Sequence, residues 1–116
     1  MKEDKLGDLS TKLAVDVLAL VKELESKKEK IISNQIGRSA TSVCANIAES
    51  KYAHGRADFI AKLEIALKEA SETGKWLEML VKSDYITDDQ YKQLNKTCST
   101  IRILLITSLK TAKAHR

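Results

Sequence analysis

Apolar side chains recur every three or four residues along most of this chain, the spacing that aligns them on one face of an α-helix. Polar breaks near 26–31, 52–55 and 83–87 interrupt the pattern, and the chain contains no proline. The pattern predicts four helices, at about 6–25, 32–51 and 56–82, and from a cap at Thr87 to about Ala114.

The predicted helices each carry an apolar stripe long enough to face a common core. The core positions are Leu6, Leu9, Leu13, Val17, Leu20, Val21 and Leu24 in the first helix, Ile36, Ala40, Val43 and Ile47 in the second, Phe59, Leu63, Ala66, Ala70, Leu77 and Val81 in the third, and Tyr91, Leu94, Cys98, Ile101, Leu105, Leu109 and Ala112 in the fourth. Long amphipathic helices with short connections predict an all-α, antiparallel up-down-up-down four-helix bundle, a single domain over 1–116. A three-helix or elongated arrangement is the alternative.

Local signals support these boundaries. Thr87 and Gln90 have the spacing of a capping box, in which each side chain accepts a hydrogen bond from the other residue's backbone N–H. Gly55 can take a left-handed backbone conformation in the break between the second and third helices. Gly74 lies within the apolar stripe of the third helix, where glycine costs about 1 kcal/mol against alanine, so we expect close packing there.

The second segment differs from an ordinary surface helix, because residues 34–50 contain no lysine. Opposite its apolar stripe it carries a polar set, Gln35, Arg38, Ser42, Asn46 and Glu49, flanked by the small residues Gly37, Thr41, Ala45 and Ala48. We expect the polar set to be buried in the assembled protein. Arg38 would find partners on another helix or subunit, and Ser42 and Asn46 would bond the backbone of a neighbouring helix. The alternative is an exposed face that binds a ligand.

The third and fourth segments hold more apolar side chains than one core uses. The surplus consists of Ile65, Trp76 and Met79, interleaved with Glu69 and Glu72, and of Ile103 and Ile106. These five apolar residues are candidates for a subunit interface, since a large aromatic side chain outside the core often anchors one. The alternative is a wide core stripe with scattered exposed side chains, which is normal for soluble proteins.

Catalytic chemistry is not indicated. Catalysis needs a nucleophile beside a base, paired carboxylates or a metal site. His54 and His115 have no metal-binding spacing with each other or with a glutamate, and no glycine-rich phosphate loop is present. Cys44 and Cys98 stand at apolar helical positions and are expected to be reduced core residues. We expect no enzymatic activity, no metal and no cofactor.

Charge gives the clearest functional indication. The net charge is +4, and no acidic residue occurs from Gln90 to the C-terminus. The candidate nucleic-acid-binding residues are Lys92, Lys96, Arg102, Lys110, Lys113 and Arg116, and a second basic group, Lys27, Lys28, Lys30, Lys51 and Arg56, flanks the second helix. These cations could contact phosphates, or they could be solvated lysines near helix C-termini. The three scattered tyrosines offer no stacking platform for bases.

The run from Asn34 to Ser50 resembles the signature of the bacterial four-helix-bundle proteins encoded in 23S rRNA intervening sequences. The polar set of the second helix matches that signature, and Ser50 replaces its usual glycine. The third helix also resembles the family, through Asp58, Phe59, Ala66, Glu72 and Leu77, although Lys68 and Glu69 stand where the family usually has Gly-Ser.

This resemblance implies a cytoplasmic bundle that assembles as a homopentamer and associates with RNA or the ribosome. A related group, the accessory variability determinant of diversity-generating retroelements, binds a reverse transcriptase and nucleic acid. The alternative is a structural or protein-binding bundle with no role on nucleic acid. No membrane partner is expected, because no apolar run reaches membrane-spanning length, and no small-molecule substrate is expected either.

Overall fold

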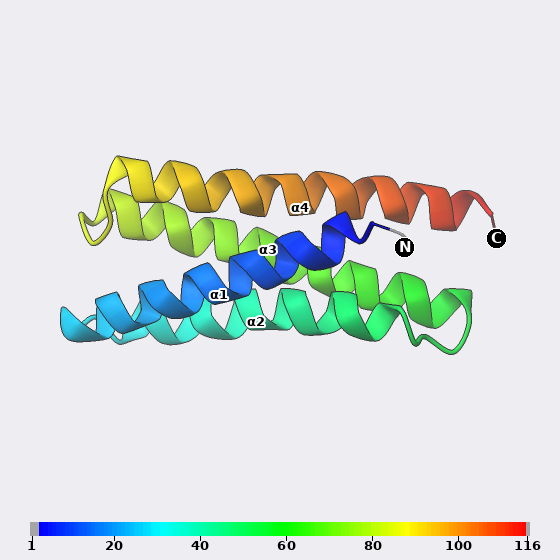
Figure 1. Ribbon diagram of the computed structural model, residues 1–116, viewed down its shortest axis with the longest axis horizontal. Coiled ribbons are helices and arrows are strands. Elements are labelled where there is room, and N and C mark those ends of the chain that lie inside the picture. The colour runs from blue at the N-terminus through cyan, green and yellow to red at the C-terminus, as the bar shows by residue number, and fades with distance from the viewer. Residues whose placement is uncertain (1–2, 116) are drawn as a thin grey trace.

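The computed structural model describes residues 3–115 and confirms the all-α fold. The helices are α1 (Lys5–Ser26), α2 (Ile31–Ser50), α3 (Arg56–Lys82) and α4 (Asp88–Ala114), and about 85% of the described residues are helical. Every bound lies within one residue of the prediction. Successive helices run in opposite directions and pack side by side, and α1 closes the bundle by contacting α4 (Figure 1).

The core is one apolar cluster contributed by all four helices. The predicted positions in α2 are all buried, as are the central positions of α1 and α4. Predicted core residues near the helix ends or at the edges of the stripes pack against this cluster but stay partly exposed: Leu6, Leu9, Val21, Tyr91, Leu94 and Ala112. The periodicity therefore identified these core positions correctly. The partly exposed ones lie at the edge of the core, where neighbouring helices cover the apolar stripe least.

The buried face of α3 is wider than its predicted stripe. Ile60 and Leu80 are buried, whereas Phe59 and Val81 at the two ends are only partly buried. The reason is that α3 contacts two neighbours, α2 on one flank and α4 on the other. Periodicity locates the centre of the buried face, and the positions of those neighbours decide its edges.

Helix α1 ends in a left-handed turn that the sequence did not predict, because the position that takes this conformation is not a glycine. Lys28 takes a left-handed conformation with φ +63°. The Glu29 N–H donates to the Leu24 carbonyl at 2.9 Å and the Lys28 N–H to the Glu25 carbonyl at 2.9 Å, the paired bonds of a Schellman motif. Non-glycine residues rarely adopt this conformation, so these bonds offset its cost.

The same motif ends α3. Asp84 has φ +63°, and the Tyr85 N–H donates to the Leu80 carbonyl at 3.0 Å. The predicted capping box then starts α4, with the Gln90 N–H donating to Thr87 Oγ1 at 3.1 Å and the Thr87 N–H to Gln90 Oε1 at 2.9 Å. The short connection between α3 and α4 is therefore held by hydrogen bonds both at the end of α3 and at the start of α4. These bonds keep the two helices in a tight antiparallel pair.

The two helix-interior glycines of the bundle differ in how tightly they pack. A Cβ atom added at Gly37 would lie 3.3 Å from Val21 Cγ2, which shows that α2 approaches α1 closely there. At Gly74 an added Cβ would lie 4.0 Å from Cys98 Sγ, an ordinary contact between α3 and α4. The predicted close approach at Gly74 is thus present but looser than that at Gly37.

The N-terminus of α2 is capped by Glu29, a residue that the sequence pattern did not single out. Its carboxylate accepts hydrogen bonds from the backbone N–H groups of Ile31 (3.1 Å), Ile32 (3.1 Å) and Ser33 (2.7 Å). Glu29 is only 7% exposed, although it lies in a run of lysines. A negative group at this end also complements the helix dipole.

We expect Glu29→Ala to lower the free energy of unfolding by about 1–3 kcal/mol, because three N–H groups lose their acceptor in a buried position. Chemical denaturation monitored by circular dichroism measures this change. The matched control is Glu25→Ala, an exposed glutamate one turn earlier, which should stay within about 0.5 kcal/mol of the wild type. Equal effects of the two changes would contradict the capping role.

Candidate functional site

An arginine bridge joins α2 to α3 at the centre of the second-helix motif. Arg38 Nη1 lies 2.7 Å from Glu69 Oε2, and Nη2 lies 2.9 Å from Glu72 Oε2. The Glu69 side chain is 8% exposed, whereas that of Arg38 is 54% exposed. The guanidinium therefore lies over a buried carboxylate. Its hydrogen bond to Glu69, more than the charge of Glu72, raises the pKa of Arg38 above its ordinary value.

A fully buried hydroxyl pair lies beside this bridge. Ser39 Oγ and Thr73 Oγ1 are 2.7 Å apart, and Thr73 Oγ1 donates to the Glu69 carbonyl at 2.9 Å. Neither residue is exposed to solvent. The prediction missed this pair, although a serine and a threonine on the core-facing sides of their helices were a signal for it. Buried hydroxyls require partners, so the pair fixes the register of α2 against α3.

The polar set of α2 is not buried within the single chain. Gln35, Arg38 and Glu49 are exposed, and Ser42 and Asn46 are half-buried. Glu49 pairs with Lys62 of α3, with 3.4 Å between Oε1 and Nζ. Burial of this set in an assembly stays a prediction.

Within the single chain, Ser42 and Asn46 bond each other instead of a neighbouring helix. Bonds to a helix of another subunit stay a prediction. Asn46 Nδ2 donates to the Ser42 carbonyl at 2.9 Å and to Ser42 Oγ at 3.1 Å, both within α2. One turn of helix separates the two residues, so the amide reaches its own backbone more readily than another helix. These bonds hold the pair in place on the surface of α2.

The candidate interface residues of α3 lie on the flank that meets this polar set. Ile65, Glu72 and Met79 are spaced by seven residues and therefore share one side of α3, and Glu72 of that side bonds Arg38. Ile65 and Met79 are 43% and 42% exposed. We call this surface the α2–α3 face: Gln35, Arg38, Ser42, Asn46 and Glu49 of α2 with Ile65, Glu72, Trp76 and Met79 of α3.

Trp76 belongs to this face but is anchored in its own chain. The side chain is half-buried and packs against the core cluster. Its Nε1 is enclosed and has no hydrogen-bond partner among the described residues. The N–H group is therefore not part of what Trp76 presents to the surface.

The outer surface of α4 combines cations with exposed isoleucines. Lys92, Lys96, Ile103 and Lys110 share one side of the helix by their spacing, and Arg102, Ile106 and Lys113 form the adjoining strip. Lys113 pairs with Glu64 of α3 at 3.0 Å. Lys92, Lys96, Arg102 and Lys110 make no ion pair with any residue in the range 3–115. Arg116 lies outside the described residues.

The isoleucines of α4 lie in the middle of this basic surface. Ile103 is 64% exposed and Ile106 is 41% exposed. The structure thus brings two sequence-predicted sets together on one helix, the candidate interface residues of α4 and the candidate nucleic-acid-binding residues. It places the other interface candidates on the α2–α3 face.

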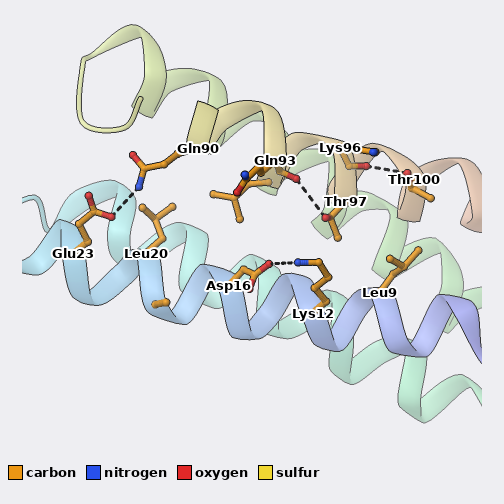
Figure 2. A pocket seen from close by; sticks show the side chains of 12 residues that line it. Leu9, Lys12, Asp16, Leu20, Glu23, Gln90, Gln93, Lys96, Thr97 and Thr100 are labelled. Carbon is orange, nitrogen blue, oxygen red and sulfur yellow. Dashed lines mark hydrogen bonds and ion pairs between the residues drawn. The ribbon is translucent and has the colours of Figure 1, made fainter. Parts of the chain in front are cut away.

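A groove of about 750 Å³ runs between α1 and α4 (Figure 2). Gln90 Nε2 donates to Glu23 Oε2 across one end of it at 3.0 Å, and Lys12 pairs with Asp16 at 2.8 Å along α1. Leucines of both helices and the polar side chains of Lys96, Thr97 and Thr100 line the rest. Its charges are of both signs, so it offers no concentrated field for an ion or a nucleic acid.

The cysteines do not form a reactive centre. Cys98 is buried, its Sγ donates to the Ala70 carbonyl at 3.2 Å, and burial raises the pKa of its thiol to about 11. Cys44 is half-buried beside Thr11, with Sγ 3.7 Å from Oγ1. Within residues 3–115, no cluster of three or more histidine, cysteine or acidic side chains could hold a metal ion. None of the described helices is both long and apolar enough to cross a membrane.

Comparison with known proteins finds a protein family and a solved structure that are similar to this chain. The model of the 23S rRNA-intervening sequence protein family matches residues 3–107. Among solved structures, the chain is similar to a protein of unknown function from the S23 ribosomal protein family of Bacteroides thetaiotaomicron VPI-5482. The TM-score is 0.89 and the identity 48%, over 90% of this chain and 98% of that chain. No curated protein matches.

We expect Arg38→Ala to lower the melting temperature by several degrees, because it leaves the buried Glu69 carboxylate without its cation. The matched control, Lys110→Ala, removes an exposed cation with no ion pair among the described residues and should leave the melting temperature nearly unchanged. Thermal unfolding, oligomeric mass and RNA binding should be measured on both variants. An Arg38→Ala protein that loses only RNA binding would show instead that this face binds a ligand.

Proposed function

This chain belongs to the 23S rRNA-intervening sequence protein family, and from that premise we propose that it is a non-enzymatic accessory protein that associates with RNA as a homo-oligomer in the cytoplasm. The family name and the S23 ribosomal name of the similar structure both point toward RNA. They do not by themselves identify the surface that would make the contact. The charges of α4 are what support our choice of that surface.

The observation behind the proposal is the group of uncompensated cations on α4. Lys92, Lys96, Arg102 and Lys110 lie on the outer surface of one helix without an acidic partner in the range 3–115. Elsewhere on the bundle, lysines such as Lys12, Lys62 and Lys75 pair with nearby carboxylates. Successive cations are separated by 4, 6 and 8 residues, which along a helix correspond to about 6, 9 and 12 Å, a range over which a phosphate backbone can be followed.

Self-association would multiply this basic surface. The α2–α3 face and the isoleucines of α4 are two exposed surfaces with apolar side chains on different sides of the bundle. Repetition of the α4 cations around an assembly would let one RNA contact several copies, which raises the overall affinity without any new type of contact. The family resemblance makes a pentamer the expected assembly.

A structural or protein-binding bundle is the competing function. The observation in its favour is that Ile103 and Ile106 interrupt the basic surface, since contacts with phosphates do not need them. Salt dependence separates the two functions, because releasing counterions from phosphates makes the affinity fall steeply with salt.

We expect the full chain to bind structured RNA with an affinity that falls linearly with salt on logarithmic axes. Replacing Lys92 and Lys110 with glutamine should weaken binding and reduce the slope by about one to two. The matched control is Lys75→Gln, a lysine that pairs with Glu78 on its own helix. Fluorescence anisotropy over a range of salt concentrations measures both quantities. Binding that is insensitive to salt, or equal losses in both proteins, would favour the competing function.

We expect light scattering to give a mass that is a multiple of the 12.9 kDa chain, five-fold if the resemblance holds. Ile103→Asp combined with Ile106→Asp should reduce the mass without unfolding the chain, because both side chains are exposed. Val15→Asp, at an α1 residue that is 59% exposed, is the matched control and should keep the assembly intact. A monomer across micromolar concentrations of the unmodified protein would rule out self-association.

A further inference from the structure

A cavity at one end of the bundle differs in its lining residues from the surfaces described above. The first turn of α1, the last turns of α4 and the connection between α2 and α3 all lie at this end (Figure 1). The cavity has a volume of about 660 Å³ and is lined by side chains from 50–59 and 107–115. This size falls within the range of about 300–1,000 Å³ that is typical of small-molecule sites.

The charged side chains that line this end cavity are both basic. They are Lys51 and Arg56, and no aspartate or glutamate lines it. Four other grooves lie on the described part of the chain, including the one between α1 and α4. Each of these four is lined by at least one acidic side chain. The end cavity is therefore the one among the five whose lining favours an anion.

Several carboxylates lie near this end. Asp4 pairs with Lys51 and, with a smaller contribution from Asp8, raises the pKa of that lysine. The Asp58 carboxylate accepts the backbone N–H of His54 at 3.0 Å, and Glu64 pairs with Lys113. Arg56 makes no ion pair with any residue from 3 to 115. Its planar guanidinium can bond two oxygens of a phosphate at once, a geometry that a lysine does not offer.

Uncharged groups complete the lining. The half-buried ring of Phe59 borders the cavity, and an aromatic face of this kind can stack against a nucleobase. Ser108 presents a hydroxyl from α4. Gly55 has φ +106°, and a Cβ added there would meet no atom within 4 Å, so a ligand can approach the backbone closely.

We propose that the end cavity binds the terminal nucleotide of a single-stranded RNA through its 5′-phosphate. Arg56 holds the phosphate, and the base stacks on Phe59. The RNA part of this proposal rests on the proposed function. The cavity, however, is separate from the outer surface of α4, so a single nucleotide probes it without the α4 cations.

The test compares ligands that differ only in the phosphate. Adenosine 5′-monophosphate and adenosine are titrated into the full chain by NMR, and short oligoadenylates with a 5′-phosphate or a 5′-hydroxyl are compared by anisotropy. We expect the phosphate to strengthen binding by about tenfold or more in both pairs, the ratio expected for a charge-assisted hydrogen-bonded contact. Arg56→Ala should remove this advantage while keeping the circular dichroism spectrum, because Arg56 is exposed.

The matched control is Arg102→Ala, an exposed arginine of α4 that does not line the cavity. It should weaken both oligoadenylates equally and leave binding of the monophosphate unchanged. Equal binding of the two oligoadenylates, or equal effects of Arg56→Ala and Arg102→Ala on the monophosphate, would overturn the end-cavity proposal while leaving RNA association through α4 intact. Binding of the free monophosphate without binding of either oligoadenylate would overturn both the end-cavity proposal and RNA association through α4.

Discussion

The seam between α2 and α3 is the constraint on which the other surfaces of this protein depend. At its centre two fully buried hydroxyls, Ser39 and Thr73, bond each other, and Arg38 lies above a carboxylate that is almost completely enclosed. Buried polar groups are costly when they lack partners, so sliding α2 along α3 by a turn would leave each of them unsatisfied. Apolar contacts alone would tolerate such a shift more readily, because leucine and alanine stripes are similar at successive turns.

This register also decides which surfaces the bundle presents. With α2 fixed against α3, the polar set of α2 lies beside Ile65 and Met79 and forms one continuous face. The α3–α4 connection, bonded through Asp84, Tyr85 and Thr87, then directs α4 back along the bundle. The basic side of α4 consequently faces outward, and its last turns meet the connection between α2 and α3 at the end cavity.

Some cations of the bundle are paired with carboxylates of a neighbouring helix, as in the contacts of Lys62 with Glu49 and of Lys113 with Glu64. Helix α4 contains no acidic residue after Asp89, so the cations beyond its first two turns can be neutralised only from another helix or another molecule. Helix α4 therefore carries four cations, Lys92, Lys96, Arg102 and Lys110, that have no ion pair within residues 3–115.

The sequence by itself determined the fold class, the helix bounds to within one residue, most of the core and the family. Helical periodicity and capping chemistry are local properties, and the 23S rRNA-intervening sequence motif is a contiguous run, so a linear reading recovers all of them. The turns at Lys28 and Asp84 escaped it, because neither position carries the glycine that usually marks a left-handed residue.

Only the tertiary structure decided which distant residues meet. Glu69 stands where the family usually has a small residue, and its role as the buried partner of Arg38 depends on α3 lying against α2 in one register. Phe59 was predicted to be a core residue, and it packs against the core cluster, yet it is only partly buried and also lines the end cavity. Pairings between residues roughly 30–50 positions apart depend on how whole helices pack against one another. The local sequence pattern holds no information on which of these residues meet.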